Sequence, residues 1–258
     1  MSKKPDLRAL SGIVLGADAD FDEVHILGGL KSTGSLNANI VDVKGSMKIA
    51  GSLWANEIKI LGGIRTGADI IADGNIEVSG GMEVGGKVEG KIIKIMGGID
   101  SKEDIIASEL EIRGGSKIGG GIKVEGMIEV IGGITAERNI SATDLITIGG
   151  FSSKRGVKIS SNIEARGIIE VEEDVECDSF EFKISGPSYI KGKLQANKIK
   201  IELDDKLKRE AFLRVKEIVS PNKIDIDYVV AEKIVCPKIN AGENCRIGEP
   251  IDKFYEPV

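Results

Sequence analysis

Residues 45–64 read GSMKIAGSLWANEIKILGGI and contain one complete repeat of a pattern that runs through most of the chain. After Gly45, apolar or small residues stand in three pairs. The pairs are Met47 and Ile49, Leu53 and Ala55, and Ile58 and Ile60. Alternation within each pair is the period of a strand that buries one face. Glycine or polar residues separate the pairs, so the repeat predicts three short strands joined by three corners.

The same repeat extends in both directions from this stretch. Glycines that open a rung recur in steps of 17 or 18 residues, at Gly28, Gly45, Gly62, Gly80, Gly97, Gly114, Gly132 and Gly149. Inward pairs also follow Gly186. A fixed period of this length indicates stacked rungs whose like side chains form columns in the interior. The sequence therefore predicts an all-β fold, a single-stranded right-handed parallel β-helix with a triangular cross-section and about 17–18 residues per rung.

The repeat also suggests domain boundaries. Residues 1–10 are expected to be an N-terminal tail, residues 11–248 the β-helix, and residues 249–258 a C-terminal tail or cap. A polar stretch at 204–210 interrupts the pattern. Residues 207–219 fit either another rung or an amphipathic helix, because Leu207, Ala211, Val215 and Ile218 would share one helical face.

A left-handed β-helix built from three hexapeptides per coil is the alternative fold. The inward pairs are separated by unequal steps of six, five and six residues, which do not repeat a six-residue motif. The spacing therefore favours the right-handed form.

Composition and charge exclude several classes of function. The chain has a net charge of -6 and a pI near 5.2, which argues against a nucleic-acid partner, since phosphates are met by basic surfaces. No run of eighteen apolar residues and no signal peptide are found, so a cytoplasmic protein is expected. The three cysteines form no C-x-x-C pair, predict no zinc site or disulfide framework, and are expected to be buried.

Candidate site residues have simpler structural interpretations. His25 falls at an outward position, in a column that continues with Asp42, Lys59, Glu77, Lys94 and Glu111, and is expected to join a solvated charge ladder. Glu172, Glu173 and Asp174 form an acidic cluster that fits a solvated corner better than a calcium site. We therefore expect no catalytic, cofactor-binding or metal-binding residues, and no cofactor.

Three stretches resemble the bactofilins, a family of polymer-forming cytoskeletal proteins. They are GSMKIAGSLWANEIKI at 45–60, ISGPSYIKGKLQANKIKI at 184–201, and VVAEKIVCPKINAGENCRIGEP at 229–250, which ends with a Cys-x-Ile-Gly step from Cys245 to Gly248. The resemblance implies a right-handed β-helix that assembles with copies of itself, without a nucleotide, through its ends, often near a membrane. This chain is longer than the small members of that family.

The sequence therefore predicts a self-assembling scaffold, not an enzyme. Its partners would be copies of itself, with a membrane surface or client proteins as further partners. Candidate self-association residues are Ile13, Leu15, Phe21, Val24 and Ile26 at the N-terminal end, and Ile251, Phe254 and Tyr255 in the C-terminal tail. Trp54 and Ile71 interrupt a polar outer face and form a candidate lateral or membrane contact. The alternatives are a soluble β-helical module that binds another protein, and a carbohydrate-active or acyl-transfer enzyme.

Overall fold

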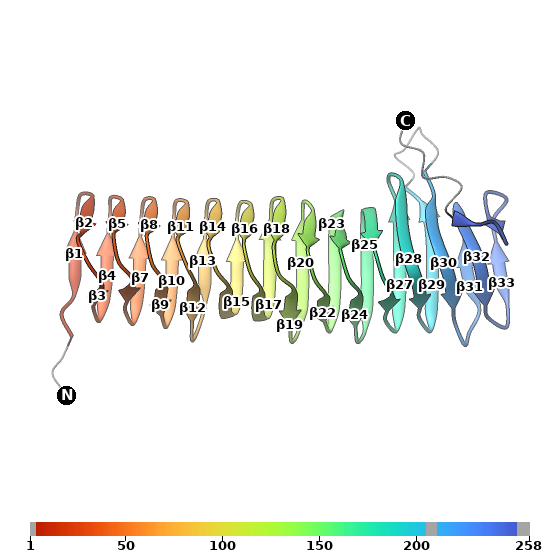
Figure 1. The fold of residues 1–258 in the computed structure, drawn as a ribbon, viewed down its shortest axis with the longest axis horizontal. Helices are drawn as coiled ribbons and strands as arrows, with labels where there is room; N and C mark the ends of the chain where they lie inside the picture. The colour runs from red at the N-terminus through yellow and green to blue at the C-terminus, as the bar shows by residue number, and fades with distance from the viewer. Residues whose placement is uncertain (1–3, 205–210, 252–258) are drawn as a thin grey trace. The chain divides into compact units, whose positions relative to one another are not determined.

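The computed structural model describes residues 4–204 and 211–251, and divides into two compact units, Met1–Glu125 (unit 1) and Gly126–Val258 (unit 2). Each unit is a parallel β-solenoid in which each strand pairs with the strand one rung away (Figure 1). No α-helix occurs in residues 4–204 and 211–251. The predicted all-β, right-handed parallel β-helix is confirmed.

Unit 1 contains strands β1 to β19, arranged in three rows that we call its first, second and third faces. The first face contains β2 (Ile13–Leu15), β5 (Leu30–Ser32), β8 (Met47–Ile49), β11 (Ile64–Thr66), β14 (Met82–Val84), β16 (Ile99–Ser101) and β18 (Ser116–Ile118). The second contains β3 (Ala19–Asp20), β6 (Leu36–Asn37), β9 (Leu53–Ala55), β12 (Ile70–Ala72), β19 (Ile122–Val124) and the first halves of β15 (Val88–Ile95) and β17 (Ile105–Arg113). The third contains β1 (Leu7–Ala9), β4 (Glu23–Ile26), β7 (Ile40–Val43), β10 (Glu57–Ile60), β13 (Ile76–Val78) and the second halves of β15 and β17.

The predicted inward positions form the core of unit 1. Leu36 pairs with Leu53, and Leu53 pairs with Ile70, so these three stack in one column. All three are fully buried. Residues between the inward positions, such as Lys48 and Trp54, point outward and are exposed. The period-two alternation thus fixes which face of each strand enters the core.

A column of glycines forms the corner between the third and first faces. At Gly62, an added Cβ would lie 2.5 Å from the carbonyl oxygen of Gly45 in the preceding rung. Gly45 meets Gly28 in the same way, and Gly80 meets Gly62. Glycine is required at this corner because the backbones of adjacent rungs approach too closely to admit a side chain.

Carboxylates stabilise the corner between the first and second faces of unit 1. Oδ1 of Asp69 accepts a hydrogen bond from the backbone N–H of Lys87 at 2.9 Å. Oδ1 of Asp104 accepts one from Gly121 at 2.7 Å, and Asp18 accepts one from Ser35 at 2.6 Å. Each carboxylate therefore satisfies an amide of the next rung where no strand pairing does so.

Unit 2 contains strands β20 to β34. They are β20 (Met127–Ile131), β21 (Ile134–Ala136), β22 (Ile140–Ala142), β23 (Asp144–Ser153), β24 (Val157–Ile159), β25 (Asn162–Val171), β26 (Val175–Glu176), β27 (Ser179–Ile184), β28 (Ser188–Gln195), β29 (Lys198–Leu203), β30 (Leu213–Val219), β31 (Ile224–Ile226), β32 (Val229–Val235), β33 (Ile239–Ala241) and β34 (Arg246–Ile247). The row β23, β25, β27, β29, β31, β33 pairs in sequence and carries the outward face described below.

Two segment assignments differ from or refine the expectation. Strand pairing begins within the expected tail, because β1 (Leu7–Ala9) pairs with β4. The repeat does not predict β1, because no glycine corner precedes Leu7. Residues 213–219 form β30, a strand paired with β28 and β32, so this part of the 207–219 segment is a rung. Residues 205–210 of the polar interruption lie outside the described residues.

Candidate functional site

The N-terminal end of unit 1 exposes part of its interior. Ile13, Leu15 and Phe21 point inward but are only half-buried, whereas Leu30, the partner of Ile13 in the next rung, is buried. In the described residues, β2 pairs with β5 and has no strand on its other side. Unpaired strand edges next to exposed apolar side chains form a surface that favours association.

Strand β1 covers the third face at that end. Leu7 and Ala9 are the register partners of Val24 and Ile26, and Val24 and Ile26 are buried. Val24 and Ile26 therefore do not belong to the exposed end, contrary to the expectation. Leu7 and Ala9 are themselves half-buried and replace them at the surface.

Among the residues that the structure describes, the C-terminal end of unit 2 also exposes apolar side chains. Ile239 and Ile247 are 39% and 47% exposed, whereas Ile224, the partner of Ile239 one rung earlier, is buried. Ile251 is buried, and its backbone N–H donates a hydrogen bond to Oε1 of Glu232 at 3.0 Å. Ile251 thus packs against unit 2 without covering Ile239. Phe254 and Tyr255, the other predicted cap residues, lie outside the described residues.

Trp54 and Ile71 are neighbours on the second face of unit 1, as the register predicted. Trp54 is 41% exposed and Ile71 is half-buried. They line a shallow groove of about 360 Å³ together with Phe21, Asn37, Asn39 and other residues. A flat aromatic wall beside amide side chains is suited to a contact that combines apolar packing with hydrogen bonds.

The charge ladder on the third face of unit 1 is confirmed. His25 pairs with Asp42 in the strand register, and Lys59 pairs with Glu77. Nζ of Lys59 lies 3.5 Å from Oε2 of Glu77, and Nε2 of His25 lies 3.1 Å from Oε2 of Glu23. These side chains are at least one-quarter exposed, so each pair contributes no more than about 1 kcal/mol to stability.

The acidic cluster at 172–174 is a corner with ion-paired carboxylates. Glu172 lies 2.6 Å from Nζ of Lys191 and accepts a hydrogen bond from the Tyr189 hydroxyl at 3.0 Å. The hydrogen bond from Lys191 is the main reason that the pKa of Glu172 lies below its usual value. Glu173 pairs with Arg155 at 2.9 Å. Asp174 accepts the backbone N–H of Lys193 at 2.7 Å.

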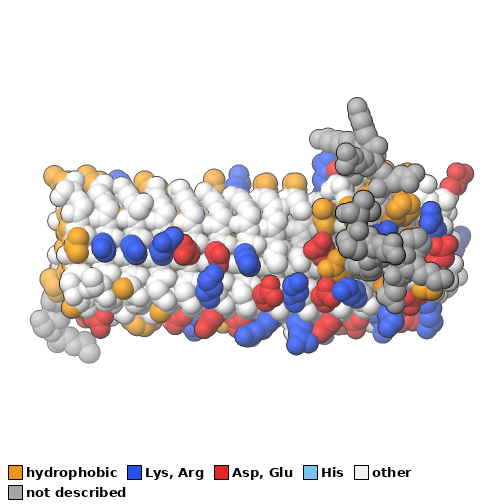
Figure 2. Space-filling view, turned by 45° about the horizontal axis from the view of Figure 1, so that its top comes forward, with side chains coloured by type: hydrophobic (Ala, Val, Ile, Leu, Met, Phe, Trp, Pro, Cys, Tyr) orange, Lys and Arg blue, Asp and Glu red, His pale blue; other side chains and the backbone are white. Residues whose placement is uncertain are grey.

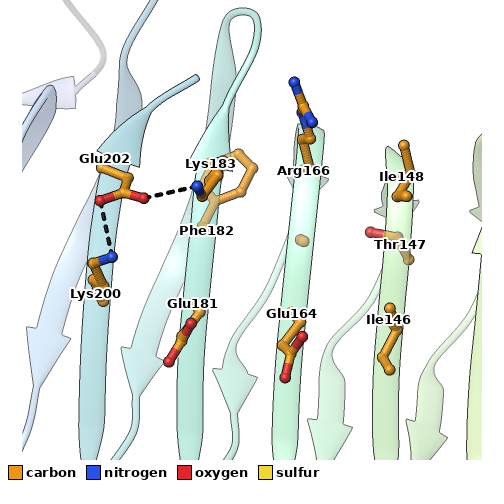
Figure 3. Close-up of a pocket in the computed structure, with 11 residues that line it drawn as sticks. Ile146, Thr147, Ile148, Glu164, Arg166, Glu181, Phe182, Lys183, Lys200 and Glu202 are labelled. Atoms are coloured by element: carbon orange, nitrogen blue, oxygen red, sulfur yellow. Dashed lines mark ion pairs between the residues drawn. The ribbon is translucent and has the colours of Figure 1, made fainter. Parts of the chain in front are cut away.

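The outward face of β23, β25, β27 and β29 in unit 2 carries a shallow pocket of about 240 Å³ (Figure 3). Ile146 and Ile148 line one side, and Glu164, Arg166, Glu181, Lys183, Lys200 and Glu202 line the rest. Glu202 pairs with Lys183 at 3.2 Å and with Lys200 at 3.0 Å, and the hydrogen bond from Lys200 is the main cause of its lowered pKa. Three basic and three acidic side chains line the pocket, so its lining carries no net charge.

Arg166, at the edge of this pocket, forms a bidentate ion pair with Asp204. The sequence pattern does not predict this pair. Nε and Nη2 of Arg166 donate to the two carboxylate oxygens of Asp204 at 2.6 and 2.8 Å. The Asp204 side chain is 10% exposed. The pair joins β25 to the residue that directly follows β29, and therefore fixes the end of β29 against β25.

An exposed apolar row in unit 1 also escaped the sequence analysis. Leu27, Leu61 and Met96 each stand immediately before the glycine corner and are 52%, 49% and 54% exposed. Lys44 and Ser79 occupy the intervening rungs. We call this row, Leu27 to Met96, the apolar ridge. The sequence signal for the ridge is an apolar residue directly before the glycine pair, as in LGGL and MGGI.

The three cysteines are free and half-buried, not fully buried as expected. Burial raises the pKa of the Cys177 thiol to about 12 and also raises that of Cys245. Among the residues that the structure describes, no three His, Cys, Asp or Glu side chains lie close enough to hold a metal ion. That part of the chain also has no helix long and apolar enough to cross a membrane.

Comparison with protein families, with curated proteins and with solved structures finds no match to this chain.

Proposed function

We propose that the chain is a self-associating scaffold that assembles through the open ends of its β-solenoid. One observation carries the proposal: Ile13, Leu15 and Phe21 at the N-terminal end stay half-buried, although their columns are buried from the next rung onward. A second copy placed end to end would complete the buried columns and pair the free strand edge.

The charge distribution near the N-terminal end is compatible with this role. The inward residues at that end are uncharged, so stacking two ends buries no unpaired ion. The outward residues on the same rung, such as Asp20, keep their ion pairs at the side, where Asp20 lies 2.8 Å from Lys4. End-to-end contact therefore gains apolar burial at small electrostatic cost.

The finer proposal is a role like that of the bactofilins, a structural and non-catalytic one. It rests on the rungs at 45–60 and 184–201 that resemble that family. In this proposal assembly needs no nucleotide, occurs in the cytoplasm, and yields dimers if one end pairs or filaments if both ends pair. Client proteins would bind the faces of the assembled solenoids.

Sedimentation velocity over a dilution series tests the proposal. We expect the wild-type protein to assemble, Phe21→Arg to lose the N-terminal joint, and Ile239→Arg to lose the C-terminal joint. We expect head-to-head association, in which each end pairs with the same end of a second copy. If both ends pair in this way, each single variant stops at dimers and the double variant is monomeric. The reason is that each joint would have to bury an unpaired charge, which costs several kcal/mol.

The matched control is Ala50→Arg, which adds the same charge at an exposed corner two rungs from the end. It should assemble like the wild type. A wild-type protein that is monomeric at high concentration, or a Phe21→Arg variant that assembles normally with native circular dichroism, would refute end-to-end association.

The exposed Trp54 beside Ile71 favours a second function, a soluble module whose second face binds another protein. Dilution separates the two proposals. A module of this kind stays monomeric at all concentrations, whereas a scaffold changes mass with concentration.

A further inference from the structure

We propose that the apolar ridge of unit 1 binds the surface of an anionic lipid bilayer. This inference does not depend on end-to-end assembly. Along one edge in Figure 2, hydrophobic side chains recur with basic ones between them. Leu27, Leu61 and Met96 stand two rungs apart, roughly 10 Å at the usual inter-strand spacing.

Stacking holds the ridge residues along one edge of unit 1. The backbone N–H of Leu61 donates to the carbonyl of Val43 at 3.0 Å, and that of Met96 donates to Val78 at 2.8 Å. Leu27 donates to Ala9 at 3.0 Å in the same way. Because each ridge residue is fixed to the preceding rung by the same bond, the three side chains project from equivalent positions. All three side chains can therefore enter a flat apolar layer to the same depth.

The charges around the ridge indicate what it contacts. On the first face, the nearest outward row has four basic and two acidic side chains. It contains Val14, Lys31, Lys48, Arg65, Glu83, Asp100 and Lys117, and it is visible as a line of blue and red in Figure 2. On the third face, the nearest row has three of each, with His25 counted as neutral.

The ridge also contains Lys44, and Arg113 stands at the equivalent position in the rung after Met96. Neither position adds an acidic side chain. The ridge and its two flanking rows therefore hold nine basic and five acidic side chains in a chain whose net charge is -6. This is a local reversal of the overall sign.

The positive local charge indicates which partner the apolar ridge binds. A second copy docked ridge to ridge would bring two surfaces of the same positive sign together, which opposes association. Anionic headgroups attract the same surface, while Leu27, Leu61 and Met96 enter the boundary between headgroups and acyl chains. Apolar tips flanked by lysine and arginine are the pattern of proteins that lie on a membrane without spanning it.

Vesicle co-sedimentation with the full chain tests the proposal. The wild type should bind vesicles of equimolar phosphatidylcholine and phosphatidylglycerol at least about tenfold more tightly than vesicles of phosphatidylcholine alone, and binding should weaken as salt rises. Leu27→Gln/Leu61→Gln/Met96→Gln should weaken binding by about tenfold or more, because it removes apolar insertion without changing charge. Lys44→Gln/Arg113→Gln should weaken binding to the mixed vesicles only.

The matched control is Trp54→Gln/Ile71→Gln/Ile106→Gln on the second face of unit 1, where Ile106 is a half-buried outward residue in the same row as Ile71. It should bind like the wild type, and a loss equal to that of the triple ridge change would overturn the proposal. Thermal melts followed by circular dichroism establish that the variants are folded. A wild type that binds neither vesicle, that binds both equally, or whose binding survives the triple ridge change would overturn the proposal. So would a triple ridge change that lowers the oligomeric mass without lipid, which would make a second copy the occupant.

Discussion

Ile105 and Ile122 are register partners in β17 and β19, and both side chains are buried in the core of unit 1. A carboxylate at either position would have to lose its water without gaining a partner. Ile122→Asp should therefore unfold the protein or destabilise it by more than about 4 kcal/mol. Thermal unfolding followed by circular dichroism measures the effect.

Lys123, the next residue, is exposed and provides the control. Lys123→Asp should change stability by less than about 0.5 kcal/mol. Equal melting temperatures for the Ile122→Asp and Lys123→Asp variants would contradict the assigned register.

The glycine column predicts a steric effect that depends on position. Gly62→Ala should destabilise the protein by about 1–3 kcal/mol, because its Cβ would contact the carbonyl oxygen of Gly45 and force the rungs apart. Gly115→Ala should be neutral or slightly stabilising, since no heavy atom lies within 4 Å of its Cβ. Urea denaturation of both variants checks the comparison, and a stable Gly62→Ala variant would show that the rungs are not so closely stacked.

The Arg166–Asp204 pair should contribute more than the exposed ion pairs. Asp204→Ala should lower the free energy of unfolding by about 2 kcal/mol, because the Asp204 carboxylate is nearly buried and makes two charge-assisted hydrogen bonds. Glu176→Ala, which removes the exposed pair with Lys158, should cost less than about 1 kcal/mol. The midpoint of urea unfolding measures both, and equal losses would show that Arg166 and Asp204 are solvated like a surface pair.

Trp54 is the single tryptophan, so its fluorescence reports on the second face of unit 1 alone. In dilute protein its emission should be that of a water-exposed indole, and iodide should quench it. If the face forms a lateral contact, assembly should shift the emission to shorter wavelength, and Trp54→Glu should leave the melting temperature unchanged while reducing bundling. Emission already at short wavelength in dispersed protein would refute the contact.

The sequence predicted the rungs well because their signal is local and repeated. The alternation of Met47 with Ile49 and of Ile58 with Ile60 is repeated every 17 or 18 residues, and each repetition supports the same register. The N-terminal strand was missed because Leu7 and Ala9 form only one pair, without a glycine corner before them. Their pairing with Val24 and Ile26 changed the composition of the predicted open end.

Contacts that do not repeat could not be predicted in this way. Arg166 and Asp204 are 38 residues apart, and their pairing depends on the position of Asp204 directly after β29 (Lys198–Leu203). The apolar ridge was overlooked for a different reason. Leu27 and Leu61 directly precede the glycines that mark each rung, where the repeat indicates a corner and not a surface.

The stacking of Gly45 on Gly28 and of Gly62 on Gly45 has a consequence for how such a chain can change in length. Each rung meets its neighbours through the same corner and the same three inward pairs, so a duplicated segment of 17 or 18 residues presents to both flanking rungs the partners they already have. We therefore expect that a chain with one whole rung added or removed by unequal recombination still folds. A gain of a single residue within a strand has no such tolerance, because it turns every following inward side chain of that strand toward water.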